Sequence, residues 1–258
     1  MGLFSKPLHS GVKLGKLPPR KDARTLKMSS FRMQLPVPPS EFDLSHRLPV
    51  LDILGNDRLG DCTAAGAGHM HQAWLAYNGV TDWSPTRAET IDFYSGSTGY
   101  DPNDPSTDSG GIMLDVLKYW RKSGFAGRQI EYFLEINPKD HIEVIASTYH
   151  FGGLYVGVNL PSVAEDQKIW DVPWYGPFGK GAPGSLGGHC IANICAITEK
   201  YLYTDTWGIN MPMTWDFWRE YVDEAYVVLS QDWYGKEGVC PTGMNVNALK
   251  TAIGESLQ

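Results

Sequence analysis

Hydrophobic residues follow helical spacing in the first half of the chain. Within residues 111–123 the large apolar residues share one helical face, and Gly124 ends the pattern. A second helix is predicted over Thr63–Asn78, with Gly79 as its stop, and a third opens at the cap pair Ser84-Pro85. The first half is therefore expected to form a helical lobe.

The pattern changes after Gly152, where short apolar runs replace the helical spacing. Runs of this length predict buried strands at residues 154–160, 190–198, 201–205 and 225–230. Helices first and strands later predict an α+β fold, in which a helical lobe packs against a sheet lobe. No internal repeat is evident.

Gly66 and Gly68 lie inside the predicted helix 63–78. Each glycine weakens an isolated helix by about 1 kcal/mol relative to alanine. Their presence predicts close packing of this helix against its neighbours, rather than a helix held by intrinsic propensity.

Cys62 stands where a turn containing Gly60 leads into that helix. The unpaired N–H groups and the positive dipole at a helix start favour a thiolate, which is the nucleophilic form of cysteine. His189 follows 127 residues later and Asp205 a further 16 residues on. A lone cysteine is more often an inert buried side chain, but a thiol, an imidazole and a carboxylate together predict a nucleophile, a base and an orienting group.

The segments around these residues resemble the papain-like cysteine peptidases, the peptidase C1 family. Residues 56–63 are similar to the family's nucleophile segment, and residues 107–114 to its Gly-Gly segment. Asp205-Thr206-Trp207-Gly208 resembles the family's Asn-Ser-Trp-Gly, with Asp in place of Asn. Residues 139–159 resemble the helix and strand that precede the catalytic His, and residues 224–229 the closing strand. The resemblance covers roughly residues 39–231, in order and with similar spacing.

The resemblance implies a papain-like two-lobe fold, with an N-terminal helical lobe, a C-terminal antiparallel β lobe and the active-site cleft between them. It also implies a role for each matching residue. These are Cys62, His189 and Asp205 as the catalytic triad, the Cys62 N–H and the Asn56 side-chain amide as the oxyanion hole, Gly110 and Gly111 as binders of substrate backbone, and Trp207 as a shield for the Asp–His hydrogen bond.

Several positions depart from the family's pattern, as in a distant branch of phage or bacterial type. Leu59 and Asp108 stand where secreted members carry a disulfide, and Thr63 replaces the Trp after the nucleophile. Asn56 keeps an amide donor but is one methylene shorter than the usual Gln. Asp61 adds a negative charge beside the nucleophile, which opposes thiolate formation unless its side chain points away.

The spacing of the four cysteines (Cys62, Cys190, Cys195 and Cys240) is not typical of a disulfide-linked protein. We therefore expect free thiols and a reducing compartment. Cys190 and Cys195 would lie about 16 Å apart along one strand, which is too far for a disulfide. His69 and His71 lack a third ligand at suitable spacing, so we expect no metal and no cofactor.

Segments that target proteins to membranes or for secretion are not evident. No apolar run approaches the roughly 20 residues of a membrane span, and Met1–Lys6 lacks the apolar region of a signal peptide. Lys6 occupies the place where a myristoylation site carries Ser or Thr. We expect a cytoplasmic or virion-associated protein that contacts no membrane.

Charge divides the chain unevenly. Residues 1–38 carry a net charge of +7 and contain several prolines, whereas residues 39–258 carry −14. We therefore expect three regions: a basic N-terminal arm (1–38), a papain-like catalytic domain (39–231) and a C-terminal extension (232–258). The arm is expected to be extended, with few helical turns, and to contact acidic surface rather than contribute to a core. Self-docking, a propeptide and docking onto a protein partner or large assembly remain alternatives, whereas the lack of an aromatic platform argues against nucleic acid.

Three functions fit these observations. The first is a cysteine peptidase that hydrolyses peptide bonds through Cys62, His189 and Asp205. The second is another acyl-transfer enzyme on the same scaffold, such as an amidase or transpeptidase. The third is a catalytically weak structural component of a phage particle or other large assembly, which the substitutions near Cys62 would suit.

Overall fold

The computed structural model describes residues 12–257. The first eleven residues of the expected arm, including the Met1–Lys6 segment on which the targeting expectation rests, lie outside the described residues. Across residues 12–257, no helix is both long and apolar enough to cross a membrane.

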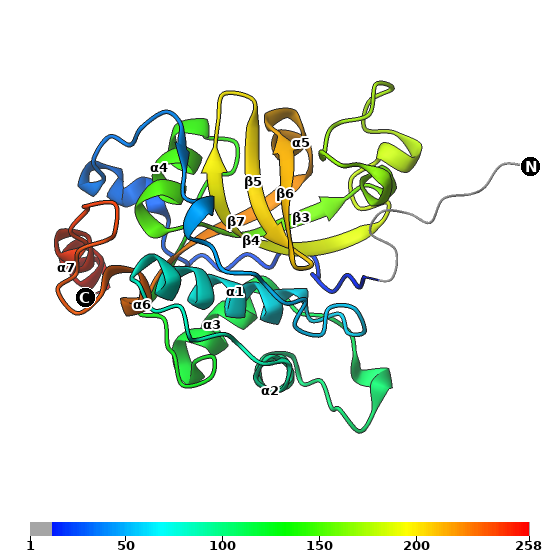
Figure 1. The fold of residues 1–258 in the computed structure, drawn as a ribbon, viewed down its shortest axis with the longest axis horizontal. Helices are drawn as coiled ribbons and strands as arrows, with labels where there is room; N and C mark the ends of the chain where they lie inside the picture. Colours follow the sequence, from blue (N-terminus) through cyan, green and yellow to red (C-terminus); the bar gives the residue numbers. More distant parts are fainter. Residues whose placement is uncertain (1–11, 258) are drawn as a thin grey trace, which may run out of the picture.

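The chain forms the two expected lobes (Figure 1). Helices α1 (Cys62–Tyr77), α2 (Arg87–Thr98) and α3 (Met113–Ser123) make up the helical lobe. An antiparallel sheet with the strand order β2-β7-β3-β4-β5-β6 makes up the other, and β1 pairs with β4. The predicted α+β fold is confirmed.

The remaining bounds are as follows. The strands are β1 (Phe42–Asp43), β2 (Tyr132–Glu135), β3 (Tyr155–Leu160), β4 (Gly187–Ile197), β5 (Tyr201–Thr206), β6 (Ile209–Thr214) and β7 (Val222–Leu229). The other helices are α4 (His141–Phe151), α5 (Trp215–Tyr221), α6 (Gln231–Tyr234) and α7 (Asn247–Ser256), and a 3₁₀ helix, η1, spans Met28–Gln34. The helices α4 and α5 pack on the sheet through β7 and β6 respectively.

Helix α1 lies at the seam between the lobes, and every one of its residues is buried. A Cβ atom on Gly66 would come within 3.3 Å of the Tyr155 ring, and one on Gly68 within 3.0 Å of the Phe125 ring. The close packing predicted from these two glycines is therefore confirmed. It holds the start of α1, and with it Cys62, against β4.

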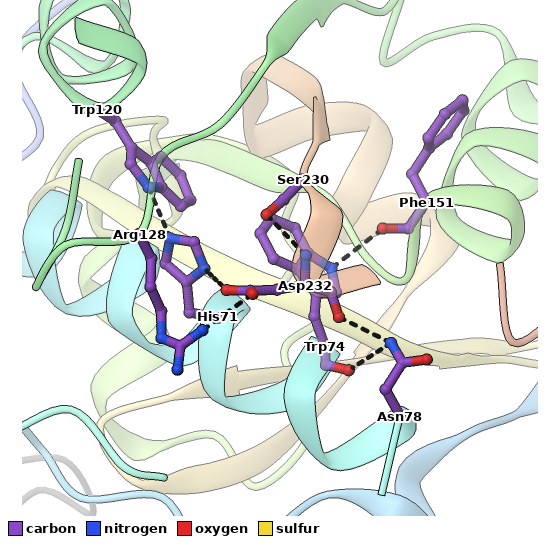
Figure 2. A network of polar contacts seen from close by, with 8 residues as sticks. All are labelled: His71, Trp74, Asn78, Trp120, Arg128, Phe151, Ser230 and Asp232. Atoms are coloured by element: carbon purple, nitrogen blue, oxygen red, sulfur yellow. Dashed lines mark hydrogen bonds and ion pairs between the residues drawn. The ribbon is translucent and has the colours of Figure 1, made fainter. Parts of the chain in front are cut away.

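A polar network fixes the far half of α1 (Figure 2). His71 Nδ1 lies 2.7 Å from the Asp232 carboxylate, and the Trp120 indole N–H donates to His71 Nε2 at 2.8 Å. Arg128 pairs with the other Asp232 oxygen at 3.0 Å. Since Nε2 accepts, Nδ1 carries the proton, and burial lowers the pKa of His71. The network joins α1, α3 and α6 around the buried His71.

His69, the other histidine of α1, is also buried. Its Nε2 contacts the carbonyl oxygen of Asp52 at 2.8 Å, and burial lowers its pKa to about 4. The ring therefore ties the helix to the loop that precedes the Cys62 turn.

The expectation for the N-terminal arm is correct in part. Residues 12–27 are largely extended, and Arg20 and Arg32 pair with Asp115 and Asp140 on the domain surface. Residues 28–34 correct the rest of the expectation: they form η1, whose apolar residues Met28 and Phe31 are buried in the core. The reason is hydrophobic: η1 contacts α4 and α7, and Met28 and Phe31 belong to the same apolar cluster as residues of those two helices.

The C-terminal extension also belongs to the core. Helix α6 buries Trp233, and α7 buries Leu249 and Ile253 against the same cluster of apolar residues. The extension is therefore packed beside the arm, where α7 contacts η1.

The Asp232 network yields a stability prediction. Replacing Asp232→Ala should lower the free energy of unfolding by about 2–4 kcal/mol, because it leaves the buried His71 proton and the Arg128 charge without their acceptor. Urea unfolding followed by tryptophan fluorescence measures the change. The matched control is Asp216→Ala, a carboxylate that is 67% exposed and paired with Arg219 on the surface, and it should cost less than about 1 kcal/mol. Equal losses in the two variants would contradict the assigned role of the network.

Candidate active site

Cys62 is the first residue of α1 and is only 2% exposed. Its sulfur accepts the backbone N–H of Cys190 at 3.4 Å, and the backbone N–H of Gly15 also lies against it. Cys190 follows His189 on β4, so this contact spans the seam between the lobes. The structure thus brings the predicted nucleophile and the predicted base to the same place.

His189 extends from β4 into this seam. Its Nε2 lies 2.7 Å from the Thr206 hydroxyl oxygen, and the Trp207 ring stacks on the imidazole with centroids 4.4 Å apart. Trp207 therefore covers the histidine beside its contact with Thr206, whereas the resemblance implied a shield for an Asp–His hydrogen bond.

The contact expected between His189 and Asp205 is made by Thr206 instead. Successive side chains of a strand point to opposite faces, so only one of two neighbours in β5 can meet the ring nitrogen. Asp205 lines the same cavity as His189 but has the Asn193 side chain beside its carboxyl group. The shift by one residue gives His189 a hydroxyl partner in place of a carboxylate.

Burial sets the protonation of the site. It raises the pKa of the Cys62 thiol to about 12 and lowers the pKa of His189 to about 3. Burial also raises the pKa of Asp205 to about 8, against a smaller lowering by Asn193. At neutral pH the thiol, the imidazole and the carboxyl group are all mainly uncharged in this structure.

The predicted oxyanion-hole residue Asn56 is buried beside Cys62 in the same cavity. Its side-chain amide donates to the Leu59 carbonyl oxygen at 3.0 Å, which stabilises the turn before α1. Asp61 in this turn is fully buried, and burial raises its pKa to about 7, while Asn56 beside it acts in the opposite direction. The charge that Asp61 places near the thiol is thereby reduced.

Residues 13–17, here called the cleft segment, run through the seam between the lobes (Figure 1). Gly111 N–H donates to the Gly15 carbonyl oxygen at 2.7 Å, and Leu17 N–H donates to the Gly111 carbonyl oxygen at 2.9 Å. On the sheet side, Lys16 N–H donates to the Gly188 carbonyl oxygen at 3.1 Å. Gly111 therefore binds an extended segment of the chain's own backbone, whereas the resemblance implied substrate backbone.

Glycines make this close approach possible. A Cβ atom on Gly15 would lie 1.7 Å from the Gly60 carbonyl oxygen, and one on Gly110 would lie 2.1 Å from the Gly15 carbonyl oxygen. Gly110 also has φ = +79°, which favours glycine. With the cleft segment in place, the cavity beside Cys62 has a volume of only about 10 Å³, close to the least that a water molecule needs.

Asp108 joins the two segments that a disulfide links in secreted members of the resembled family. Its carboxylate accepts the Gly60 N–H at 3.1 Å and the Tyr94 hydroxyl at 2.7 Å. The Tyr94 oxygen in turn accepts the Gly110 N–H at 2.9 Å. All four cysteines are free, which confirms the expectation for the thiols.

Comparisons with known proteins identify the fold. No protein-family model matches the chain, and no curated protein matches it. Among solved structures it is similar to xylellain, a cysteine protease from Xylella fastidiosa, with a TM-score of 0.62 and 15% identity over 89% of this chain and 99% of that one.

Two protease precursors show the same likeness. Procathepsin L2 from the larval midgut of Tenebrio molitor matches with a TM-score of 0.56 and 10% identity, over 88% of this chain and 81% of that one. Procathepsin B from Trypanosoma congolense matches with a TM-score of 0.52 and 10% identity, over 86% and 88%. The chain has the fold of papain-like cysteine proteases.

Sequence reasoning missed two parts of the site. Thr206 matches the family's serine in sequence, but its hydroxyl gives no separate signal there. Lys16 counts in the sequence as one charge of a basic arm, whereas its ammonium group is fully buried between Asp223 and Glu224. In the sequence, only the absence of proline around Gly15 indicates that this part of the arm is an ordered, extended segment.

Asp205 gives a pH-dependent prediction. Because its pKa in the folded protein is raised from 3.8 to about 8, folding is penalised progressively as the pH rises from about 4 to 8. An amide cannot ionise, so Asp205→Asn should raise the free energy of unfolding at pH 8, with a gain that shrinks toward zero near pH 4. Urea unfolding at both pH values measures the gain, with the exposed Asp216→Asn as the matched control. A gain that does not depend on pH would show that the carboxyl group is not held neutral by burial.

Proposed function

We propose that the protein is a papain-like cysteine peptidase that hydrolyses peptide bonds through Cys62 and His189. The observation that carries the proposal is their juxtaposition: both line one cavity at the seam, the nucleophile at a helix start and the base on the adjoining strand. The way Gly111 binds an extended segment of backbone beside the sulfur supports a peptide as the substrate.

The mechanism is acyl transfer by a thiolate. His189 takes the thiol proton, and the Cys62 sulfur attacks the carbonyl carbon of the scissile bond. The resulting oxyanion is stabilised by the Cys62 backbone N–H and the Asn56 amide, once that amide turns from Leu59. The imidazolium then protonates the leaving amine, and a thioester remains. Water, deprotonated by His189, hydrolyses the thioester and releases the acid and the free thiol.

Thr206 acts in this scheme as a positioning residue. Its hydroxyl oxygen accepts the Nε2 proton of His189, which leaves Nδ1 as the nitrogen that exchanges a proton with Cys62. The hydroxyl stabilises the imidazolium less than a carboxylate would, since the hydrogen bond carries no full charge on the acceptor.

The cleft segment holds the enzyme in a latent form. It covers Cys62, occupies the backbone-binding Gly111 and leaves no room for a substrate. It also excludes water, and this desolvation keeps the thiol and the imidazole neutral. Activity therefore requires the segment to leave the cleft, which restores hydration and allows the thiolate–imidazolium pair to form.

Displacing the segment by mutation tests the latent form. In Gly15→Ala, the new methyl group collides with the Gly60 carbonyl oxygen, so the segment cannot dock. A thiol-directed peptidyl epoxide at pH 7 should label Cys62 at least about 10-fold faster in this variant than in the unmodified chain, since the thiol becomes accessible and ionisable. The readout is the labelling rate at each cysteine, by peptide mass spectrometry.

The matched control is Gly254→Ala, because a Cβ atom there meets no neighbour within 4 Å. It should leave the labelling rate unchanged. If Gly15→Ala labels Cys62 no faster than the buried Cys240 and cleaves no peptide, the chain is a structural component built on a peptidase fold, and the peptidase proposal fails. Labelling with hydrolysis of simple amides alone would favour an amidase.

The assignment of Thr206 has a separate test. In the Gly15→Ala background, Thr206→Val should lower kcat/KM for a fluorogenic peptide by about 10- to 100-fold, because the imidazole loses the partner that fixes its orientation. The pH profile should change as well, since Nε2 no longer has an acceptor. If Asp205→Asn instead costs more than Thr206→Val at every pH, the orienting group is Asp205, as the sequence predicted.

A further inference from the structure

The Lys16 side chain enters a pocket in the sheet lobe and is completely buried there. Its ammonium nitrogen lies 2.7 Å from the Asp223 carboxylate and 3.4 Å from the Glu224 carboxylate. The Asn159 amide donates to the same Asp223 oxygen, and the Tyr226 hydroxyl donates to the other Glu224 oxygen. The pocket therefore ends in two carboxylates whose positions are fixed by polar neighbours.

A β-bulge brings these two carboxylates together. Asp223 and Glu224 are consecutive in β7, and consecutive side chains of a regular strand point to opposite faces. Gly157 pairs with Glu224 and Val158 pairs with Val222, so Asp223 is the extra residue of the bulge. Bulges redirect side chains and are common beside active sites. Here the bulge turns both acids toward one ammonium group.

The wall of the pocket is shaped for a long side chain. A Cβ atom on Gly157 would lie 2.3 Å from the Lys16 Cε and 2.7 Å from the Glu224 Cγ. Any larger residue at this position would close the pocket. Glycine in a strand interior weakens the strand and often marks a close approach by a ligand, which is the case here for the Lys16 methylenes.

The pocket also adjoins the nucleophile. Lys16 follows Gly15, whose backbone N–H lies against the Cys62 sulfur, and the Lys16 charge itself acts on the thiol. A peptide that replaced the cleft segment would place a side chain in this pocket within a residue or so of its scissile bond. The contents of the pocket would then decide which sequences are cleaved.

The pocket holds two carboxyl groups for one ammonium group. Glu224 Oε1 has no hydrogen bond among the described residues, only the ion-pair contact with Lys16. When the segment leaves, the buried Glu224 and the partly exposed Asp223 lose their buried ion-pair partner, which is unfavourable. An ammonium group of a bound peptide at the same place would restore the ion pairs.

We propose that this pocket is a substrate subsite for a basic side chain, and that the latent enzyme fills it with its own Lys16. The proposal rests on the peptidase function above and names its substrate class: peptides with lysine close to the scissile bond, with arginine accepted less well because the contact to Gly157 leaves little width. The cleft segment inhibits by presenting the side chain that the subsite selects.

The test uses the full chain with Gly15→Ala and Lys16→Ala, so that the segment leaves the cleft and the pocket is empty. A positional library of fluorogenic peptides places lysine, arginine, norleucine or glutamate at each position before the scissile bond. At one position, kcat/KM for lysine should exceed that for norleucine, which has the same four-carbon chain without the ammonium group, by at least about 10-fold, as expected for a buried charge-assisted contact. Cleavage without such a preference, or with norleucine preferred, would overturn the proposal.

The acids are tested in the same background. Glu224→Gln and Asp223→Asn are nearly isosteric, and each should reduce the ratio of kcat/KM for lysine over norleucine several-fold. Asp216→Asn, on the surface of the same lobe, is the matched control and should leave the ratio unchanged. An unchanged ratio in both pocket variants, with unfolding curves like that of the parent, would also overturn the proposal.

Binding separates this proposal from the peptidase proposal. Fluorescence polarisation of labelled peptides with the variant Gly15→Ala, Lys16→Ala, Cys62→Ala reports the subsite without any chemistry. If no peptide is hydrolysed by the Gly15→Ala, Lys16→Ala chain but the lysine peptide binds at least about 10-fold tighter than the norleucine peptide, the subsite stands and the peptidase proposal fails. Equal binding of both peptides, with or without hydrolysis, means that the pocket serves only to anchor the segment.

Discussion

The structure depends on the burial of α1 on all sides. A helix at the seam between two lobes must present apolar or fully hydrogen-bonded side chains in every direction, because an unsatisfied buried polar group is costly. Alanine and glycine supply the close contacts, and His69 and His71 each have fixed partners. The position of Cys62 relative to β4 follows from this packing, since neither lobe can move without breaking contacts to the same helix.

The sequence predicted the elements that carry strong local signals. The Gly-rich turn and the Ala-rich helix located Cys62, and the apolar runs located β3, β4, β5 and β7 to within a few residues. Weaker signals were not recognised: β6 and α5 contain polar and aromatic residues in no simple period, and the helix expected at Ser84-Pro85 begins at Arg87 with Thr86 as its cap.

Within the site, sequence position alone could not decide side-chain direction. The match to the family's Asn-Ser-Trp-Gly segment drew attention to Asp205 and Thr206, which are the last two residues of β5, but which of the two faces His189 depends on the pleat and pairing of the strand. The same limit applies to Lys16, whose partners converge only because of the bulge at Asp223. The net charges predicted attraction between the arm and the domain, but they did not predict that Lys16 is buried inside the sheet lobe.

The hydrogen-bonded link at Asp108 has a mechanical consequence. A disulfide would tie the Cys62 turn to the Gly110 loop by a single covalent bridge and leave other elements independent. The Asp108 carboxylate instead needs the Tyr94 hydroxyl, and Tyr94 belongs to α2 and also receives the Gly110 N–H. A displacement of α2 would therefore pull on the turn before the nucleophile and on the backbone-binding glycines together. A shift of α2 would thus be transmitted to both walls of the cleft. Because the link consists of hydrogen bonds, it forms without an oxidant, and reducing thiols do not break it.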